Sequence, residues 1–333
     1  SAAAAKVLAL QPALDERLAL GRALAGLGQL AVRTLPGAGA TDAERDAWLA
    51  EARAVAAART QPVVADRLTV LRALAGQVLA GRFDDAPLRW VPPHAKVEDL
   101  GAGRVRVTWD FSDPAQAQDW QPVPTRAEDE RRGAPVHALS GADGLAVRDG
   151  GLELAGTGTW SSSLAFAAPL SIEYEAKVGQ PIVVKGLGEG PESGPMQFGL
   201  RLCADATGSY LFCFGFGTLY ARDVLRVLEQ QKESPYSTFY IGAPYHLRLE
   251  HDGQRLRALV EGTEAAAIPV LDRTHGRLEL WCRSEATVRL DRLVVEATID
   301  RAGLAPQRDA WVAGQLAALG LADADVPAAG GAR

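Results

Sequence analysis

Two glutamates, Glu173 and Glu175, are the clearest candidates in this sequence for paired acid–base chemistry. Residues 172–178 alternate apolar and polar side chains, which predicts a half-buried strand with both glutamates on one face. Retaining glycosidases use two carboxyl groups about 5–5.5 Å apart, one as nucleophile and one as acid–base catalyst. The same alternation also predicts a solvated face without any chemistry. A catalytic pair and a solvated face are therefore both open.

Aromatic side chains offer a second chemistry, because an indole ring can stack on the apolar face of a sugar while nearby polar groups bind its hydroxyls. Trp281 is the best candidate, since the strand pattern places it on the same face as Arg277 and Arg283. Trp160 is a further candidate, although aromatic residues in a sandwich usually belong to the core. Glu189 lies in a glycine-rich stretch that is predicted to be a loop bordering a ligand groove. Packing under a loop or a helix is the alternative for Trp281.

A metal site is suggested only by Asp110 and Asp291. Asp110 comes directly after the first predicted strand, and Asp291 lies on the last. Calcium prefers carboxylate and carbonyl oxygens, so the two could share an ion if those strands are neighbours. Pairing of each aspartate with an adjacent basic residue is the alternative. The three cysteines are widely spaced and the five histidines are isolated, which argues against structural zinc and a disulfide framework. No organic cofactor is expected.

Composition and charge exclude several classes of protein. The 333 residues are 47% hydrophobic and 23% charged, as is typical of a globular protein of about two domains. The net charge is −6 without a basic block, so a nucleic-acid partner is not expected. No apolar run approaches the roughly 18 residues of a transmembrane helix. Because the chain begins with Ser, we expect it to be processed or part of a longer protein; its location stays open, with the extracytoplasmic space or cell envelope favoured.

The first quarter of the chain shows helical periodicity. Residues 12–81 are predicted to form three helices, and Thr41 with Glu44 has the spacing of a capping box at the start of the second. Gly81 is expected to end the third helix. The Pro-, Gly- and Asp-rich segment 83–103 breaks the periodicity and is predicted to be a linker.

From Arg104 onward the apolar period becomes two, which predicts antiparallel strands. Two Asp-Gly dipeptides predict two-residue hairpin turns. The expected cross-strand pairs are Leu145–Leu154 and Val147–Leu152 around Asp149-Gly150, and Leu249–Leu256, Leu247–Ala258 and Glu250–Arg255 around Asp252-Gly253. The apolar phase changes near Asp291-Arg292, which predicts a β-bulge.

These patterns predict a mainly β protein: an antiparallel two-sheet jelly-roll sandwich with an N-terminal helical bundle and a short C-terminal helix. The expected organisation is a helical region at 1–82, a linker at 83–103, the sandwich at 104–300, a helix at 301–321 and a flexible tail at 322–333.

Residues of about 104–300 resemble the concanavalin A-like lectin/glucanase superfamily, near its laminin G-like and keto-disaccharide-hydrolase-like bacterial domains. The resemblance is carried by Trp109-Asp-Phe-Ser-Asp-Pro114, Gly151-Leu-Glu-Leu154, the hairpin 245–262 with its His-Asp-Gly and Val-Glu-Gly, Gly276-Arg-Leu-Glu-Leu-Trp281 and the strand 288–295. It implies a sandwich whose concave sheet often binds sugar, and an edge site that often holds calcium. Glucanases of the superfamily carry Glu-x-Asp-x-(x)-Glu. Here Lys177 stands where the third acid would be, so the resemblance does not carry over the catalytic run.

Three functions remain as hypotheses. The first is a non-catalytic carbohydrate-binding or adhesive module with a helical docking or spacer region. The second is a glycoside hydrolase or sugar lyase using Glu173 and Glu175. The third is a protein-interaction module of a larger envelope or signalling protein, in which the groove is filled by its own side chains.

Overall fold

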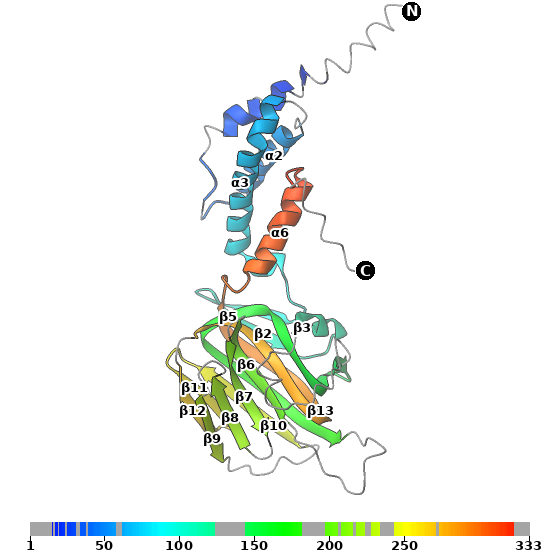
Figure 1. Cartoon of the computed structure of the whole chain (residues 1–333), viewed down its shortest axis with the longest axis vertical. Helices are drawn as coiled ribbons and strands as arrows, with labels where there is room; N and C mark the ends of the chain where they lie inside the picture. The colour runs from blue at the N-terminus through cyan, green and yellow to red at the C-terminus, as the bar shows by residue number, and fades with distance from the viewer. Residues whose placement is uncertain are drawn as a thin grey trace, which may run out of the picture. The chain divides into compact units, whose positions relative to one another are not determined.

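A computed structural model of the chain describes residues 15–322 apart from 16, 19, 24, 31–33, 38, 58–61, 124–143, 182–196, 206–207, 216–217, 224–227, 234–242 and 271–272. The chain forms two compact units. A helical unit is built from Ser1–Pro92 together with Ala305–Arg333, and a β-sandwich unit is built from Pro93–Leu304. In sequence, the sandwich is therefore inserted into the helical unit (Figure 1).

The helical unit contains α2 (Asp42–Ala56), α3 (Pro62–Asp85), the short α4 (Pro87–Trp90) and α6 (Ala305–Ala318), with further helical residues within 15–30. The predicted capping box is confirmed, because Thr41 Oγ1 accepts from the Glu44 amide while the Glu44 carboxylate accepts from the Thr41 amide. None of the described helices is both long and apolar enough to cross a membrane.

The helix α6 completes the core of the helical unit. Leu316 is buried in a cluster with Trp48, Ala52 and Val78 from α2 and α3. The helix ends at Ala318, and Gly320 follows with a positive φ of 77° that lets the Leu321 amide reach back to the Leu316 carbonyl at 2.8 Å. The C-terminal helix is thus a structural member of the N-terminal bundle.

The predicted linker at 83–103 is wrong. The helix α3 continues past Gly81 to Asp85, α4 follows, and Lys96–Gly101 forms a strand. Gly81 keeps a helical conformation because Phe83, two residues further on, is buried and holds the last turn in place. Most of the predicted tail at 322–333 lies outside the described residues.

The sandwich unit is antiparallel throughout its described pairings, which confirms the predicted fold class. Its elements are β1 (Lys96–Gly101), β2 (Arg104–Trp109), the 3-10 helix η1 (Pro114–Asp119), β3 (Trp120–Pro122), β4 (Leu145–Arg148), β5 (Gly151–Pro181), β6 (Gln197–Asp205), β7 (Gly208–Gly215), β8 (Thr218–Asp223), β9 (Leu228–Glu233), β10 (Pro244–His251), β11 (Arg255–Val260), β12 (Thr263–Pro269) and β13 (His275–Ile299).

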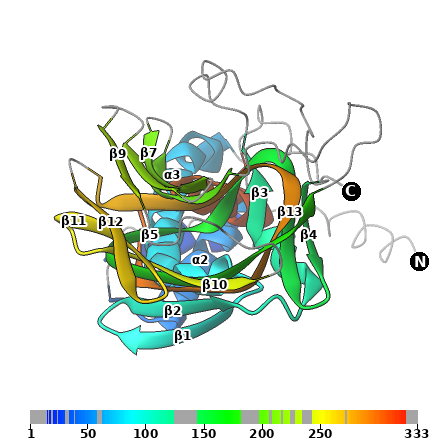
Figure 2. The same ribbon diagram turned by 90° about the horizontal axis from the view of Figure 1, so that it is seen from below.

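Two long strands, β5 and β13, run through both layers of the sandwich (Figure 2). The later half of each lies in the first layer, ordered β12-β11-β10-β5-β13-β2-β1. The earlier half of β13 and residues 156–167 of β5 lie in the second layer, ordered β5-β13-β6-β7-β8-β9, with β3 also paired to β5. The first residues of β5, 152–154, pair with β4 and with residues 288–290 of β13. Sharing these two strands fixes the layers against each other.

The core lies between the layers. Tyr174 of the first layer meets Phe198 of the second edge-to-face at 6.1 Å between ring centroids, and His251 meets Tyr210 at 6.3 Å. Apolar residues at alternate positions fill the rest, as the period of two predicts. They include Val107, Trp109, Leu247, Leu249, Leu278, Leu280, Leu293 and Val295.

One predicted hairpin is confirmed and the other is wrong in register. Around Asp149-Gly150, Leu145 pairs with Leu154 as expected. After β10, His251 pairs with Leu256, so the loop is two residues longer than the turn expected at Asp252-Gly253. Glu250 consequently lies opposite Arg257 instead of Arg255. A shift of two residues leaves every side chain on its original face, so the apolar pattern could not reveal it.

The β-bulge predicted near Asp291-Arg292 is confirmed. Leu290 pairs with Ala176 while Arg292 pairs with Glu175, so Asp291 is an extra residue in β13. The phase change buries Leu290 and Leu293 on the core side and exposes Arg292 on the outer face of the first layer.

Candidate functional site

The outer face of the second layer, opposite the core, holds buried polar residues. Glu279 of β13 lies between Ser161 of β5 and Arg201 of β6. Arg201 is 2% exposed and Glu279 4%, and Arg201 Nη1 lies 3.8 Å from Glu279 Oε2. A charge this deeply buried must be paired, because leaving water costs an unpaired ion several kcal/mol.

Two hydroxyl residues complete this polar row. Arg201 Nη1 donates to Thr159 Oγ1 at 3.5 Å. Ser161 is 6% exposed, and its Oγ has no hydrogen-bond partner in the described part of the chain. A buried hydroxyl without a partner is uncommon.

Trp281 lies one step further along β13 on the same face. Its cross-strand neighbours are Thr159 of β5 and Gly199 of β6. Gly199 has no side chain, so the indole has no side-chain neighbour at the paired β6 position. Trp281 is half-buried, which leaves part of its ring open to a partner.

Arg277 extends the polar face in the other direction along β13. It is half-buried, and burial lowers the pKa of its guanidinium, an effect that the nearby Glu279 carboxylate partly offsets. The face therefore combines two guanidinium groups, one carboxylate, two hydroxyls and one indole, named as Arg201, Arg277, Glu279, Thr159, Ser161 and Trp281. It can offer directional hydrogen bonds next to an aromatic surface.

Sequence reasoning placed Trp281 and Arg277 on this face but missed Arg201, Thr159 and Ser161. The one available signal was Arg201 itself, a single charge inside the apolar run from Phe198 to Cys203. Strand periodicity assigns a residue to a face but does not say whether that face is covered. Burial of the outer face thus escaped prediction.

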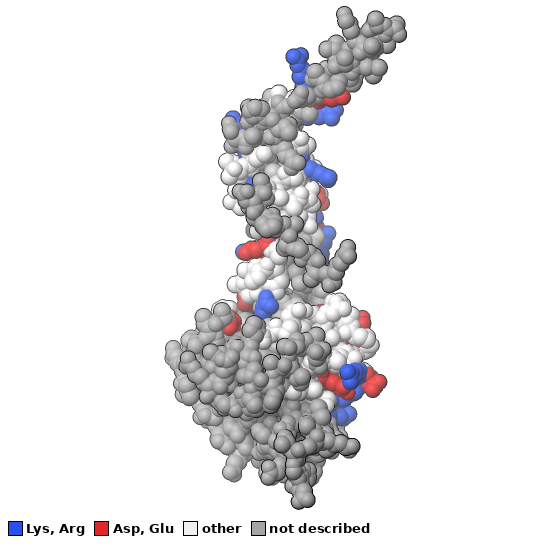
Figure 3. All heavy atoms as spheres, turned by 45° about the vertical axis from the view of Figure 1, so that its right-hand side comes forward, with Lys and Arg blue, Asp and Glu red and all other residues white. Residues whose placement is uncertain are grey.

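Glu173 and Glu175 lie on the outer face of the first layer. Glu173 Oε1 is 3.4 Å from Arg248 Nη1, and the Glu173 side chain is 44% exposed. Glu175 is exposed, with His246 and Arg292 as its cross-strand neighbours. Acidic and basic side chains adjoin each other on the described surface of the sandwich visible in Figure 3. This is the arrangement expected for a solvated face.

The remaining sugar-binding candidates are not all described. Trp160 is 3% exposed and lies opposite Leu280, so its ring packs in the core. Arg283 belongs to β13, but its side chain lies outside the described structure, as does the whole of Glu189.

The two calcium candidates are both held by cationic neighbours. Hydrogen bonds from Lys96, and then from Ser112, hold the pKa of the Asp110 carboxyl well below its usual range. Partial burial would raise the pKa of Asp291, but hydrogen bonds from Lys177 and Arg289 outweigh it and lower that pKa.

Asp291 is paired directly with a cation, because its Oδ2 lies 2.8 Å from Lys177 Nζ. The described residues include no group of three acidic, histidine or cysteine side chains able to hold a metal. The calcium site stays a prediction.

Comparison with known proteins shows likeness in fold alone. No protein-family model and no curated protein sequence matches the chain. Among solved structures, a beta-glucanase from Bacillus licheniformis is 9% identical, with a TM-score of 0.43, over 59% of this chain and 99% of its own.

Two further structures resemble the chain to a similar or lesser degree. A protein with a galectin-like fold from Bacillus subtilis is 10% identical, with a TM-score of 0.42, over 58% of this chain and 96% of its own. The carbohydrate-binding module CBM66 from the same organism is 13% identical, with a TM-score of 0.30, over 44% and 84%.

Proposed function

We propose that the sandwich is a non-catalytic carbohydrate-binding module and that its binding face is the outer face of the second layer. The observation that carries the proposal is the position of Trp281, half-buried between Gly199 and Thr159 and next to the buried polar row. Sugars are bound by stacking of their C–H faces on aromatic rings, combined with a few directional hydrogen bonds.

The polar row supports this role because it is organised before a ligand arrives. Arg201 is held by Glu279 and Thr159, so its guanidinium loses little freedom when a sugar hydroxyl binds nearby. The Ser161 hydroxyl, which has no partner among the described residues, supplies a group that can both donate and accept. Together with Trp281, these groups offer stacking and hydroxyl recognition on one face.

Glu279 acts in this proposal as a positioning residue. Its contact with Arg201 orients that guanidinium, whereas catalysis by a retaining mechanism would require a second carboxyl group about 5–5.5 Å away. The helical unit has its own core and is proposed as a docking or spacer element. An extracytoplasmic or cell-envelope location, where polysaccharides are accessible, is part of the proposal.

A screen of immobilised polysaccharides tests the proposal. We expect the wild-type chain to bind at least one of them and Trp281→Ala to weaken that binding by at least about tenfold, since an aromatic stacking surface is lost. Trp281→Phe should give an intermediate loss. Trp90→Ala, which removes a half-buried indole from the helical unit, is the matched control and should leave binding unchanged.

Two results would overturn the proposal. The first is an absence of binding to every polysaccharide, which would favour a protein-interaction module. The second is equal binding by wild type and Trp281→Ala. Release of reducing sugar that is abolished by Glu173→Gln would instead establish the hydrolase hypothesis; circular dichroism of each variant checks that folding is retained.

A further inference from the structure

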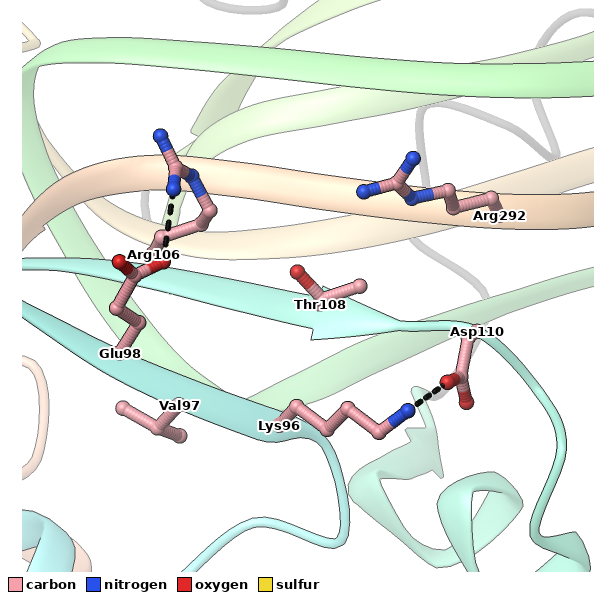
Figure 4. Close-up of a pocket in the computed structure, with 7 residues that line it drawn as sticks. All are labelled: Lys96, Val97, Glu98, Arg106, Thr108, Asp110 and Arg292. Carbon is pink, nitrogen blue, oxygen red and sulfur yellow. Dashed lines mark hydrogen bonds and ion pairs between the residues drawn. The ribbon is translucent and has the colours of Figure 1, made fainter.

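A polar pocket lies on the outer face of the first layer, on the opposite side of the sandwich from Trp281. Its volume is about 420 Å³, within the usual range for small-ligand sites. Its lining comes from β1, the end of β2 and the bulged part of β13 (Figure 4): Lys96, Val97, Glu98, Arg106, Thr108, Asp110 and Arg292.

Two of the three cations in the pocket are already paired. Arg106 Nη1 lies 2.7 Å from Glu98 Oε2, and Arg106 Nη2 lies 2.7 Å from Glu296 Oε1. Lys96 donates to the Asp110 carboxylate. These pairs place a carboxylate beside the charge of both Arg106 and Lys96.

Arg292 is the cation without such a pair. It is exposed, and it makes no hydrogen bond or ion pair with any described residue, although Glu175 is its cross-strand neighbour on β5. Figure 4 shows the Arg292 guanidinium, on β13, extending toward that of Arg106 on β2. The Thr108 side chain of β2 lies between these two arginines in the view. The extra residue Asp291 turns Arg292 onto this face, which is the way that bulges re-aim side chains near binding sites.

We propose that this pocket binds the carboxylate of an acidic sugar, with Arg292 as its main contact. The planar guanidinium fork matches a carboxylate, and the Thr108 hydroxyl can donate a further hydrogen bond. Three cations and two carboxylates line the pocket, and Glu296 also pairs with Arg106, so Arg292 supplies the positive charge that is open to an anion. The carboxylates Glu98 and Asp110 repel doubly charged anions and can accept hydrogen bonds from sugar hydroxyls. The assignment to a sugar rests on the proposed function, whereas the assignment to a carboxylate rests on the pocket alone.

Saturation-transfer NMR with D-glucuronate as probe tests this site, and D-glucose is the neutral control. At constant ionic strength we expect saturable binding of glucuronate and none of glucose. Arg292→Gln should weaken glucuronate binding by at least about tenfold, because a charge-assisted hydrogen-bonded pair is lost. Arg255→Gln removes the same charge from an exposed position on β11 and should leave binding unchanged.

Three outcomes would overturn the inference: equal binding of glucose and glucuronate, equal binding by wild type and Arg292→Gln, or binding of sodium sulfate in a thermal-shift assay without binding of glucuronate. Trp281→Ala should retain glucuronate binding here. A polysaccharide screen that fails while glucuronate still binds would therefore remove the proposed function and leave this pocket in place.

Discussion

The two outer faces of the sandwich have similar sequence patterns and different environments. On the first layer, Arg248 and Arg257 both contact Glu250, and these arginine side chains are more than 40% exposed. On the second layer, Arg201 and Glu279 make a comparable pair that is almost fully buried. Water therefore screens the first set and not the second. The contribution of an ion pair at alternate strand positions to the free energy of unfolding therefore depends on whether other segments bury it.

The largest expected effect comes from breaking the buried pair. Arg201→Met should destabilise the folded state by about 3–5 kcal/mol, because it takes the Arg201 charge away from the buried Glu279 carboxylate. The matched change Arg248→Met, on the solvated face, should cost less than about 1 kcal/mol. Urea denaturation measures both free energies of unfolding.

The double variant Arg201→Met with Glu279→Leu sharpens this prediction. Replacing both buried ions by apolar residues should recover much of the loss, since no uncompensated charge remains. Equal costs for Arg201→Met and Arg248→Met would show that the two faces are solvated alike.

A smaller effect on the free energy of unfolding is expected from protonation of His251. This residue lies on the core side of β10, between the layers. Its Nε2 donates to the Arg273 carbonyl, and its Nδ1 accepts from the Gly253 amide, each at 3.0 Å. Burial lowers the pKa of this imidazole below its ordinary value of 6.5, and neighbours including Asp252 partly offset the shift. The unfolded chain then binds the proton more readily than the folded one, so stability should be full above about pH 6.5 and decline as the pH falls below it.

Urea denaturation between pH 8 and pH 5.5 measures this slope. His251→Gln should flatten it, whereas His246→Gln, at an exposed outer position of the same strand, should leave it in place. A wild-type stability that does not change across this range would contradict the assignment of His251 as a buried neutral group.

The smallest effect on the free energy of unfolding is expected from an ion pair on the outer face of the first layer. Arg257→Gln removes the ion pair with Glu250 and should cost about 0.2–1 kcal/mol at low salt. The cost should shrink further in 1 M NaCl, where the screening length is about 3 Å. A cost that is large or insensitive to salt would mean that this face is covered like that of the second layer.

Regular elements of the fold were predictable wherever a local pattern sufficed. The capping box at Thr41 and the turn at Asp149-Gly150 depend on backbone chemistry within a few residues. The bulge at Asp291 was visible because an odd insertion changes the apolar phase. The hairpin after His251 was not, because a shift of two residues preserves that phase.

The candidate sites were predictable in part. Sequence alternation placed Trp281 and Arg277 on one strand face, and it placed Glu173 and Glu175 on another. It could not pair Glu279 with Arg201, because those residues are far apart in the chain and meet only through the neighbouring strands β13 and β6. The pocket at Arg292 likewise depends on β1, which lies in the segment predicted to be a linker.

The amino-acid order by itself determined the helical and strand periods, the two-layer class of the sandwich and the face on which each strand residue lies. These features follow from local geometry and from the burial of apolar side chains. Only the tertiary structure decided that α6 joins the N-terminal helices and that β5 and β13 serve both layers. It also decided that Arg201 is buried, while Arg292 is exposed and has no ion pair with any residue that the structure describes. These outcomes depend on contacts between residues distant in the chain, and on which faces other segments exclude from water.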